Sequence, residues 1–194
     1  NPTAQVDELT NQVVCNGDTT SIVEFATQNT GGTTTYTWTN NTPSIGLSDS
    51  GTGDILAFTA INSSTEPVVA TITVTPTFEN GGIDCDGEDK TFTITVNPTV
   101  GVNALVDQYI TSGQTSSLVN ISSTTTNVTF DWTAVADSGI TGLVDFSSTD
   151  TTIIPAETLF NSGTEPLEVT YTIYPVLDSP IDCPVDPITY KVIV

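Results

Sequence analysis

The chain has 194 residues and carries 23 acidic side chains against two lysines and no arginine, so its formal net charge is −21 at neutral pH. Such a chain is a poor partner for nucleic acid and for anionic membranes, because both are bound through lysine and arginine. Histidine is absent and no apolar stretch is long enough to span a bilayer, which argues against zinc binding, histidine-dependent catalysis and direct membrane insertion.

Residues 1–96 show the alternation of apolar and polar side chains that is typical of β-strands. In residues 70–75 the apolar side chains would lie on one face of a sheet and the threonines on the other. Threonine is β-branched and suits the exposed face of a strand, and clusters of Gly, Asn, Asp, Ser and Pro separate the alternating segments. The predicted strands cover residues 10–15, 20–26, 34–40, 55–61, 68–76 and 90–96.

The second half of the chain repeats the first. Its predicted strands cover residues 105–111, 116–121, 127–133, 152–157, 167–175 and 187–194. Four matching segments recur in the same order at offsets of 94 to 99 residues: Asn1-Pro2-Thr3 and Asn97-Pro98-Thr99, Trp38 and Trp132, Thr65-Glu66-Pro67 and Thr164-Glu165-Pro166, Ile83-Asp84-Cys85 and Ile181-Asp182-Cys183. This recurrence predicts two tandem copies of one domain, residues 1–96 and 97–194.

Six or seven short antiparallel strands per copy, with one tryptophan in a middle strand, predict an all-β fold of two immunoglobulin-like β-sandwiches. Trp38 and Trp132 alternate with threonine, as core residues do, and we interpret them as core anchors; stacking on a sugar is the alternative. The proline in the short joint at residues 97–99 predicts an extended arrangement of the two copies. Because the chain opens on the same tripeptide, we expect a segment of a longer array. Because it shows neither a membrane-spanning stretch nor a signal peptide, we expect a mature, soluble piece.

The three cysteines can be interpreted through the repeat. Cys85 and Cys183 are counterparts, whereas the counterpart of Cys15 is Thr111. The simplest interpretation is a disulfide between Cys15 and Cys85 in the first copy, with Cys183 left as a free thiol in the second. Three free buried thiols are the alternative. A disulfide would indicate an oxidising, extracellular setting.

Five segments of the first copy carry a further pattern: residues 13–17, 36–47, 51–53, 70–76 and 92–98. These segments resemble the PKD-like repeats of giant cell-surface proteins of Bacteroidota, of which the gliding-motility adhesins are the best-known examples. The second copy resembles them less closely: it keeps Trp132 and the Thr-Glu-Pro segment but lacks the first cysteine. The resemblance implies secretion, surface attachment and service as a stalk or adhesive filament, with neighbouring repeats and an extracellular target such as a surface polysaccharide as partners. It does not imply an enzyme.

Acidic residues gather in one loop of each copy. Carboxylate oxygens suit Ca²⁺, although neither loop has the spacing of an EF-hand and an acidic loop is usually only solvated. We therefore expect no required cofactor, and name Ca²⁺ as the ion that these loops could bind. The candidate ligands are Asp84, Asp86, Glu88 and Asp89 in the first copy and Asp178, Asp182 and Asp186 in the second.

Two further hypotheses compete with a structural repeat. The triplets Asp49-Ser50-Gly51 and Asp137-Ser138-Gly139 resemble the paired loops of an aspartic protease, in which two carboxylates share one proton. Asp-Ser-Gly is also common in turns, and we expect no catalysis. A carbohydrate-binding module would need exposed aromatic side chains, and Tyr174 is the best candidate because it is out of phase with the inward-pointing residues of its strand.

Overall fold

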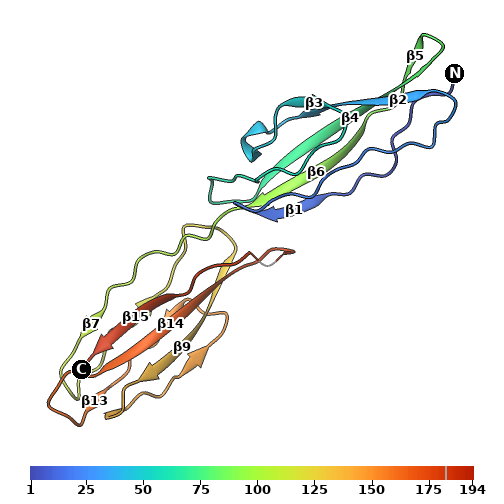
Figure 1. The fold of residues 1–194 in the computed structure, drawn as a ribbon. Coiled ribbons are helices and arrows are strands. Elements are labelled where there is room, and N and C mark those ends of the chain that lie inside the picture. Colours follow the sequence, from blue (N-terminus) through green and yellow to red (C-terminus); the bar gives the residue numbers. More distant parts are fainter. Residues whose placement is uncertain (182) are drawn as a thin grey trace. The chain divides into compact units, whose positions relative to one another are not determined.

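The computed structural model describes residues 1–181 and 183–194, which form two compact units, Asn1–Thr99 and Val100–Val194 (Figure 1). Both units are all-β; in the described residues the helical structure is confined to one 3₁₀ turn, η1 (Pro43–Ile45). The tripeptide Asn97-Pro98-Thr99 belongs to unit 1. Asn97 pairs with Cys15, and the side chain of Asn16 donates a hydrogen bond of 2.9 Å to the hydroxyl of Thr99.

Unit 1 is built on one sheet with the strand order β1-β6-β4-β2-β3, and β5 pairs with the far end of β4. All these pairs are antiparallel except β1 and β6, which run parallel, so the expectation of antiparallel strands throughout is wrong at β1. The strands are β1 (Gln12–Cys15), β2 (Thr33–Asn40), β3 (Ser50–Thr52), β4 (Val68–Asn80), β5 (Ile83–Asp86) and β6 (Lys90–Asn97).

The layer that covers this sheet is held by isolated bridges. Thr19 pairs with Thr59 and Val23 with Ile55, in the two segments expected as strands at residues 20–26 and 55–61. Side chains from both layers, including Trp38, Ile72, Ile94, Val23 and Ile55, form one buried apolar core. The alternation of the sequence places Ala70, Ile72 and Val74 of β4 and Phe92, Ile94 and Val96 of β6 in this core, and the threonines between them on the other face.

Unit 2 has a sheet with the corresponding order β11-β9-β14-β15-β7, in which β7 runs parallel to β15. Two pairs of short strands, β12-β8 and β10-β13, lie apart from it. The core joins Trp132, Tyr171 and Ile173 of the sheet to Ile154 of β12 and to Ile121, which follows β8. The strands are β7 (Gln108–Tyr109), β8 (Val119–Asn120), β9 (Val128–Ala136), β10 (Ile140–Thr141), β11 (Ser147–Ser148), β12 (Ile153–Ile154), β13 (Phe160–Asn161), β14 (Glu168–Leu177) and β15 (Ile188–Ile193).

Candidate functional site

Polar side chains at matching positions of the two units make the same hydrogen bonds. In unit 1 the carboxamide of Gln12 donates to the carbonyl of Ser21 and accepts from its N–H. In unit 2 the carboxamide of Gln108 makes both bonds with Ser117. Each glutamine therefore ties the first strand of its unit to the segment that follows.

An asparagine fixes the end of the last strand in each unit. Asn62 donates from Nδ2 to the carbonyls of Glu66 and Val96 at 2.8 and 2.7 Å, and Asn161 donates to Glu165 and Val194 at 2.8 Å each. The recurring Thr-Glu-Pro segment is thus the turn that this asparagine holds. The sequence carries a signal for the bond, because both copies place an asparagine four residues before the glutamate of that segment.

The tryptophans are core residues, as expected. Trp38 and Trp132 are 7 % and 2 % exposed. Each indole N–H donates to a backbone carbonyl, that of Gly53 at 3.1 Å and that of Ile153 at 3.2 Å. A buried, hydrogen-bonded indole has no free face for a sugar, so stacking of a ligand on either tryptophan is excluded.

The cysteines differ from the expectation. Cys85 is a free cysteine, and Cys15 and Cys183 are disulfide-bonded. The predicted disulfide between Cys15 and Cys85 and the predicted free thiol at Cys183 are therefore both wrong.

The register of the unit 1 sheet explains why Cys15 and Cys85 do not pair. Cys15 lies opposite Asn97, next to the pair of Val96 with Val68, while Cys85 lies opposite Phe78. Ten residues of β4 therefore separate the two levels, roughly 33 Å at about 3.3 Å per residue. A disulfide needs Cα atoms within about 7 Å. In Figure 1 the β5 hairpin and the arrowhead of β1 lie at opposite ends of unit 1.

The acidic loop of unit 1 is exposed, and two of its carboxylates are bound to threonines. Asp86 accepts from the hydroxyl of Thr77 at 2.8 Å and Asp89 from that of Thr75 at 2.5 Å. Within residues 1–181 and 183–194, no three His, Cys, Asp or Glu side chains are grouped in a way that could hold a metal ion. Asp182 lies outside the described residues, so Ca²⁺ binding by the second loop stays a prediction.

The two Asp-Ser-Gly triplets occupy different structural positions. Asp49-Ser50-Gly51 leads into the edge strand β3, where Gly51 lies opposite Trp38. Asp137-Ser138-Gly139 forms the turn after β9, and the carboxylate of Asp137 accepts from the N–H of Glu168 at 2.9 Å. The first triplet is part of a sheet edge and the second closes a turn between strands, so the pair lacks the matched loops of an aspartic protease.

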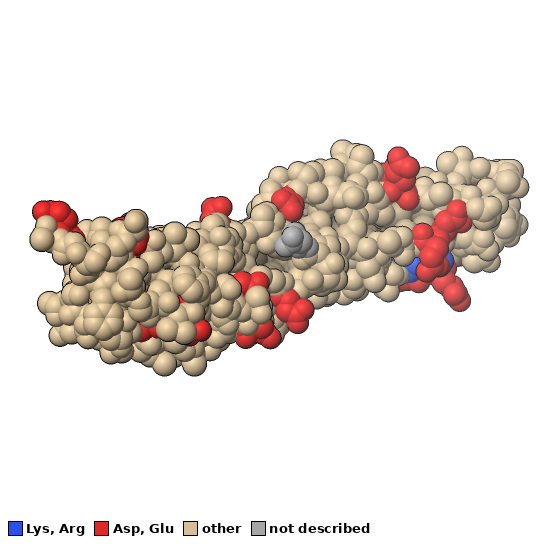
Figure 2. All heavy atoms as spheres, turned by 90° about the horizontal axis from the view of Figure 1, so that it is seen from below, with Lys and Arg blue, Asp and Glu red and all other residues tan. Residues whose placement is uncertain are grey.

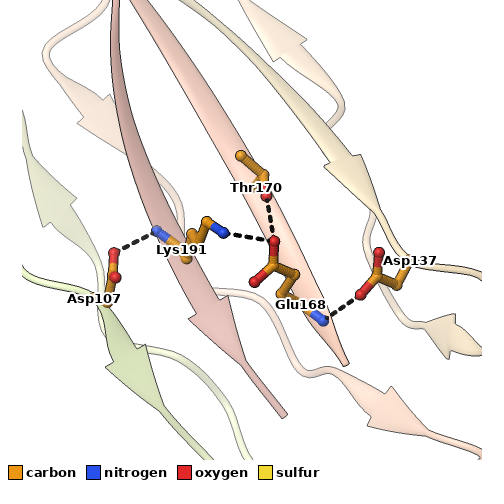
Figure 3. A network of polar contacts seen from close by, with 5 residues as sticks. All are labelled: Asp107, Asp137, Glu168, Thr170 and Lys191. Carbon is orange, nitrogen blue, oxygen red and sulfur yellow. Dashed lines mark hydrogen bonds and ion pairs between the residues drawn. The ribbon is translucent and has the colours of Figure 1, made fainter. Parts of the chain in front are cut away.

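Unit 2 has a network of charged groups across β14 and β15 (Figure 3). The ammonium of Lys191 donates to Glu168 Oε1 at 2.7 Å, and the hydroxyl of Thr170 donates to the same oxygen at 3.2 Å. This bond to Glu168 raises the pKa of Lys191. Asp107 accepts from the Lys191 backbone N–H at 2.8 Å, which ties the segment before β7 to β15. Every acid in this network has a structural donor, so the network holds strands together.

Buried ionisable groups lie in the core of unit 2. Burial, and then the charges of Glu157 and Asp145, raise the pKa of Tyr171 to about 12, and burial raises that of Tyr190. The two rings lie 5.5 Å apart between centroids. Glu157 is buried, and its Oε1 accepts from the N–H groups of Val144 and Asp145. This carboxylate was not singled out from the sequence; its role is to fix the loop before β11.

Aromatic side chains are exposed on unit 2. Tyr109 is 79 % exposed and Tyr174 is 43 % exposed, so Tyr174 does point outward as its strand phase predicted. Phe146 and Phe160 are exposed as well. These four side chains are the surface features of unit 2 that a ligand could stack on.

The acidic side chains are spread over the surface. Figure 2 shows Asp and Glu on one face in several separate groups among neutral residues, with the blue of a lysine visible only beside acids. Lys90 forms an exposed ion pair of 3.4 Å with Glu8. Among the described residues, no helix is long and apolar enough to cross a membrane.

The comparison with known families agrees with this architecture. A family model described as a PKD-like domain matches residues 108–194, the copy that is the more divergent from the resemblance given above. No curated protein matches the chain. The match supports an immunoglobulin-type β-sandwich for this half, and PKD-like domains are typically extracellular and generally non-catalytic.

Proposed function

We propose that the chain is a non-catalytic repeat segment of a secreted cell-surface adhesin. The observation that carries the proposal is the recurrence of one set of structural hydrogen bonds, through Gln12 and Asn62 in unit 1 and Gln108 and Asn161 in unit 2. The recurring polar groups maintain the fold of a repeated module. The PKD-like match of residues 108–194 supports the same class of module.

In this role the repeats act as a stalk or adhesive filament, in surface attachment or gliding motility. The short proline-containing joint predicts that each added repeat lengthens the array. Its partners are the neighbouring repeats and an extracellular target such as a surface polysaccharide. The acidic surface keeps the array soluble and disfavours anionic targets.

Small-angle X-ray scattering tests the stalk. The expected result is a maximum dimension near twice that of either unit expressed alone. A compact profile typical of one globular protein of this length would contradict the stalk. Attachment of cells that display the chain to polysaccharide-coated glass, compared with cells that display an unrelated acidic β-sandwich, tests the adhesive role separately.

A carbohydrate-binding module is the second candidate, and the exposed aromatic side chains of unit 2 favour it. Tyr109 and Tyr174 present rings on which a sugar could stack. A glycan array with the intact chain and with Tyr109→Ala and Tyr174→Ala variants separates the candidates. Binding that both substitutions weaken supports the module, whereas no bound glycan leaves the stalk as the function.

A further inference from the structure

Unit 2 has an open depression of about 270 Å³ where its last strand ends. Ile110, Thr111 and Ser112 form one side, the turn at Thr164-Glu165-Pro166 forms another, and Val194 lies in it. All the residues that line it belong to unit 2. Its lining combines the apolar residues Ile110, Pro166 and Val194 with small polar residues such as Thr111 and Ser112. An extended peptide can use both kinds of group, because its backbone forms hydrogen bonds while its side chains pack on apolar surface.

The register of the two sheets identifies the equivalent place in unit 1. Gln12 pairs with Ile94 in the parallel pair β1-β6, and Gln108 pairs with Val192 in the parallel pair β7-β15. Two residues further along, Val96 and Val194 each give their carbonyl to the asparagine that fixes the end of the strand. Counting forward from the glutamines, Thr111 corresponds to Cys15 and Ser112 to Asn16.

In unit 1 this place holds the chain that follows Val96. Asn97 extends the parallel pair by lying opposite Cys15, and it is buried. The N–H of Asn16 donates to the carbonyl of Asn97 at 2.9 Å, and the side chain of Asn16 donates to the hydroxyl of Thr99 at 2.9 Å. One segment thus fills the end of the unit through both backbone and side-chain bonds.

We propose that the depression of unit 2 is a binding site for an extended peptide segment of the Asn-Pro-Thr type that continues β15 after Val194. Its first residue would lie opposite Thr111, and its first carbonyl would accept from the N–H of Ser112. The proline fixes φ and favours the extended conformation of the asparagine before it, so little conformational entropy is lost when the segment binds. The site deepens the proposed repeat function, on which it rests, because a following repeat would attach there.

The side chain at position 112 sets the specificity of this site. In unit 1, Asn16 accepts the N–H of Asn62 through Oδ1 and still has Nδ2 to donate to Thr99. In unit 2, the hydroxyl of Ser112 accepts the N–H of Asn161 at 3.0 Å and donates to the carbonyl of the same residue at 3.3 Å. Ser112 therefore has no second donor for a threonine at the third position, and the first two residues of the segment determine binding.

The test appends three residues to the full chain after Val194. The proposal predicts that an Asn-Pro-Thr extension slows amide hydrogen exchange at Ser112 at least tenfold and raises the melting temperature of unit 2 by a few degrees. A Gly-Gly-Gly extension is the matched control, since it equally converts the terminal carboxylate of Val194 to an amide. Equal exchange at Ser112 with the two extensions would overturn the proposal.

A second variant tests the specificity. In the parent chain, Asn-Pro-Thr and Asn-Pro-Ala extensions should protect Ser112 equally. After Ser112→Asn, Asn-Pro-Thr should protect the amide at position 112 several-fold more than Asn-Pro-Ala does. No difference between the extensions after Ser112→Asn would contradict the correspondence with Asn16. None of these outcomes depends on adhesion or scattering, so a failure of this site and a failure of the adhesin function are distinguishable.

Discussion

Asn62 is 4 % exposed and donates to the carbonyls of Glu66 and Val96. Its loss removes the donor from the buried Val96 carbonyl, whereas the exposed Glu66 carbonyl keeps the bond from the Ser64 hydroxyl. Each unsatisfied buried acceptor costs about 1–3 kcal/mol. We expect Asn62→Ala to lower the free energy of unfolding of unit 1 by about 1–3 kcal/mol, and Asn161→Ala to cost less because Asn161 is half-exposed. Urea unfolding measures both. Asn103→Ala, at an exposed position, is the control and should change stability by less than about 0.5 kcal/mol. An equal effect at all three positions would contradict the structural role of the two asparagines in the recurring turn.

The cysteine assignment makes a prediction about thiol chemistry. Titration of the native chain with a thiol reagent should find one reactive cysteine, and peptide mapping should place it at Cys85. Cys85→Ser should remove the reaction with little change in melting temperature, because β5 is an exposed edge strand. Cys15→Ser should instead add a reactive thiol, because the cysteine that formed the disulfide with Cys15 then has no bonding partner. Three reactive thiols in the native chain would refute this assignment.

The buried tyrosines of unit 2 predict a loss of stability at alkaline pH. Because the pKa of Tyr171 is raised to about 12, the unfolded chain releases the phenolic proton first as the pH rises above its ordinary value of 10. The free energy of unfolding therefore falls between about pH 10 and 12, by about 1.4 kcal/mol per pH unit for each such tyrosine, and is unaffected by them below pH 10.

Urea unfolding at pH 9, 10 and 11 measures this slope, which should be smaller in Tyr171→Phe and Tyr190→Phe. The Tyr190 hydroxyl is buried without a hydrogen-bond partner among the described residues, so Tyr190→Phe should be neutral or stabilising at pH 7. Identical slopes in the parent chain and both variants would show that neither tyrosine causes the loss.

At the scale of the strand, the pairing of β2 with β3 depends on a residue without a side chain. Gly51 lies opposite Trp38, and a Cβ at position 51 would collide with the indole ring. Gly51→Ala must displace the indole from the core, and we expect it to destabilise unit 1 by about 1–3 kcal/mol. Ser50→Ala, on the exposed side of the same strand, is the control. Thermal unfolding, followed by tryptophan fluorescence, measures the melting temperatures of the two variants. Equal melting temperatures for Gly51→Ala and Ser50→Ala would mean that the indole can move without loss of stability.

The long strands could be predicted from the sequence because each has one buried face. In β4 and β14 the alternation of Val, Ile and Thr directly reflects which side faces the core. The β4-β5 hairpin also had a signal, the Gly81-Gly82 pair at φ of 67° and 77°, which suits a two-residue turn. The covering layer was predicted as regular strands, but in unit 1 bonds such as that from the Phe58 N–H to the Thr20 hydroxyl replace the ladder.

The cysteines could not be predicted because sequence spacing does not show which end of a sheet a residue occupies. Cys85 was paired with Cys15 on the repeat alone, whereas the hairpin at Gly81-Gly82 carries Cys85 to the far end of β4. The spacing of Asn62 and Asn161 from the Thr-Glu-Pro segment gave a signal only for their local bonds to that turn. Their bonds to the last strand were hidden, since these link positions more than 30 residues apart. The order and direction of the strands determine both the cysteine pairing and the asparagine bonds, and the alternation of apolar and polar residues does not reveal that order.

At the scale of the whole molecule, charge is evenly divided: residues 1–96 carry −11 and residues 97–194 carry −10. The two lysines reduce the repulsion among the acidic side chains only slightly, because Lys90 and Lys191 are each paired with one glutamate at the surface. Like charges repel one another more strongly in the compact folded state than in the expanded chain. Salt should therefore raise the melting temperature of both units without any specific ion site.

Calcium distinguishes screening from binding. The acids of the first loop are exposed and, within the described residues, form no group of three that could hold a metal ion. If charge screening is the only effect, CaCl₂ and MgCl₂ at equal ionic strength should raise the melting temperature equally. Divalent ions of the same charge screen alike, whereas a cage of carboxylates would prefer Ca²⁺ because Mg²⁺ gives up its water reluctantly. Differential scanning calorimetry in the two salts, with NaCl as reference, measures the difference. A stabilisation by Ca²⁺ several degrees above that by Mg²⁺ would contradict pure screening, and Asp178→Asn and Asp186→Asn would then show whether the second acidic loop is the site.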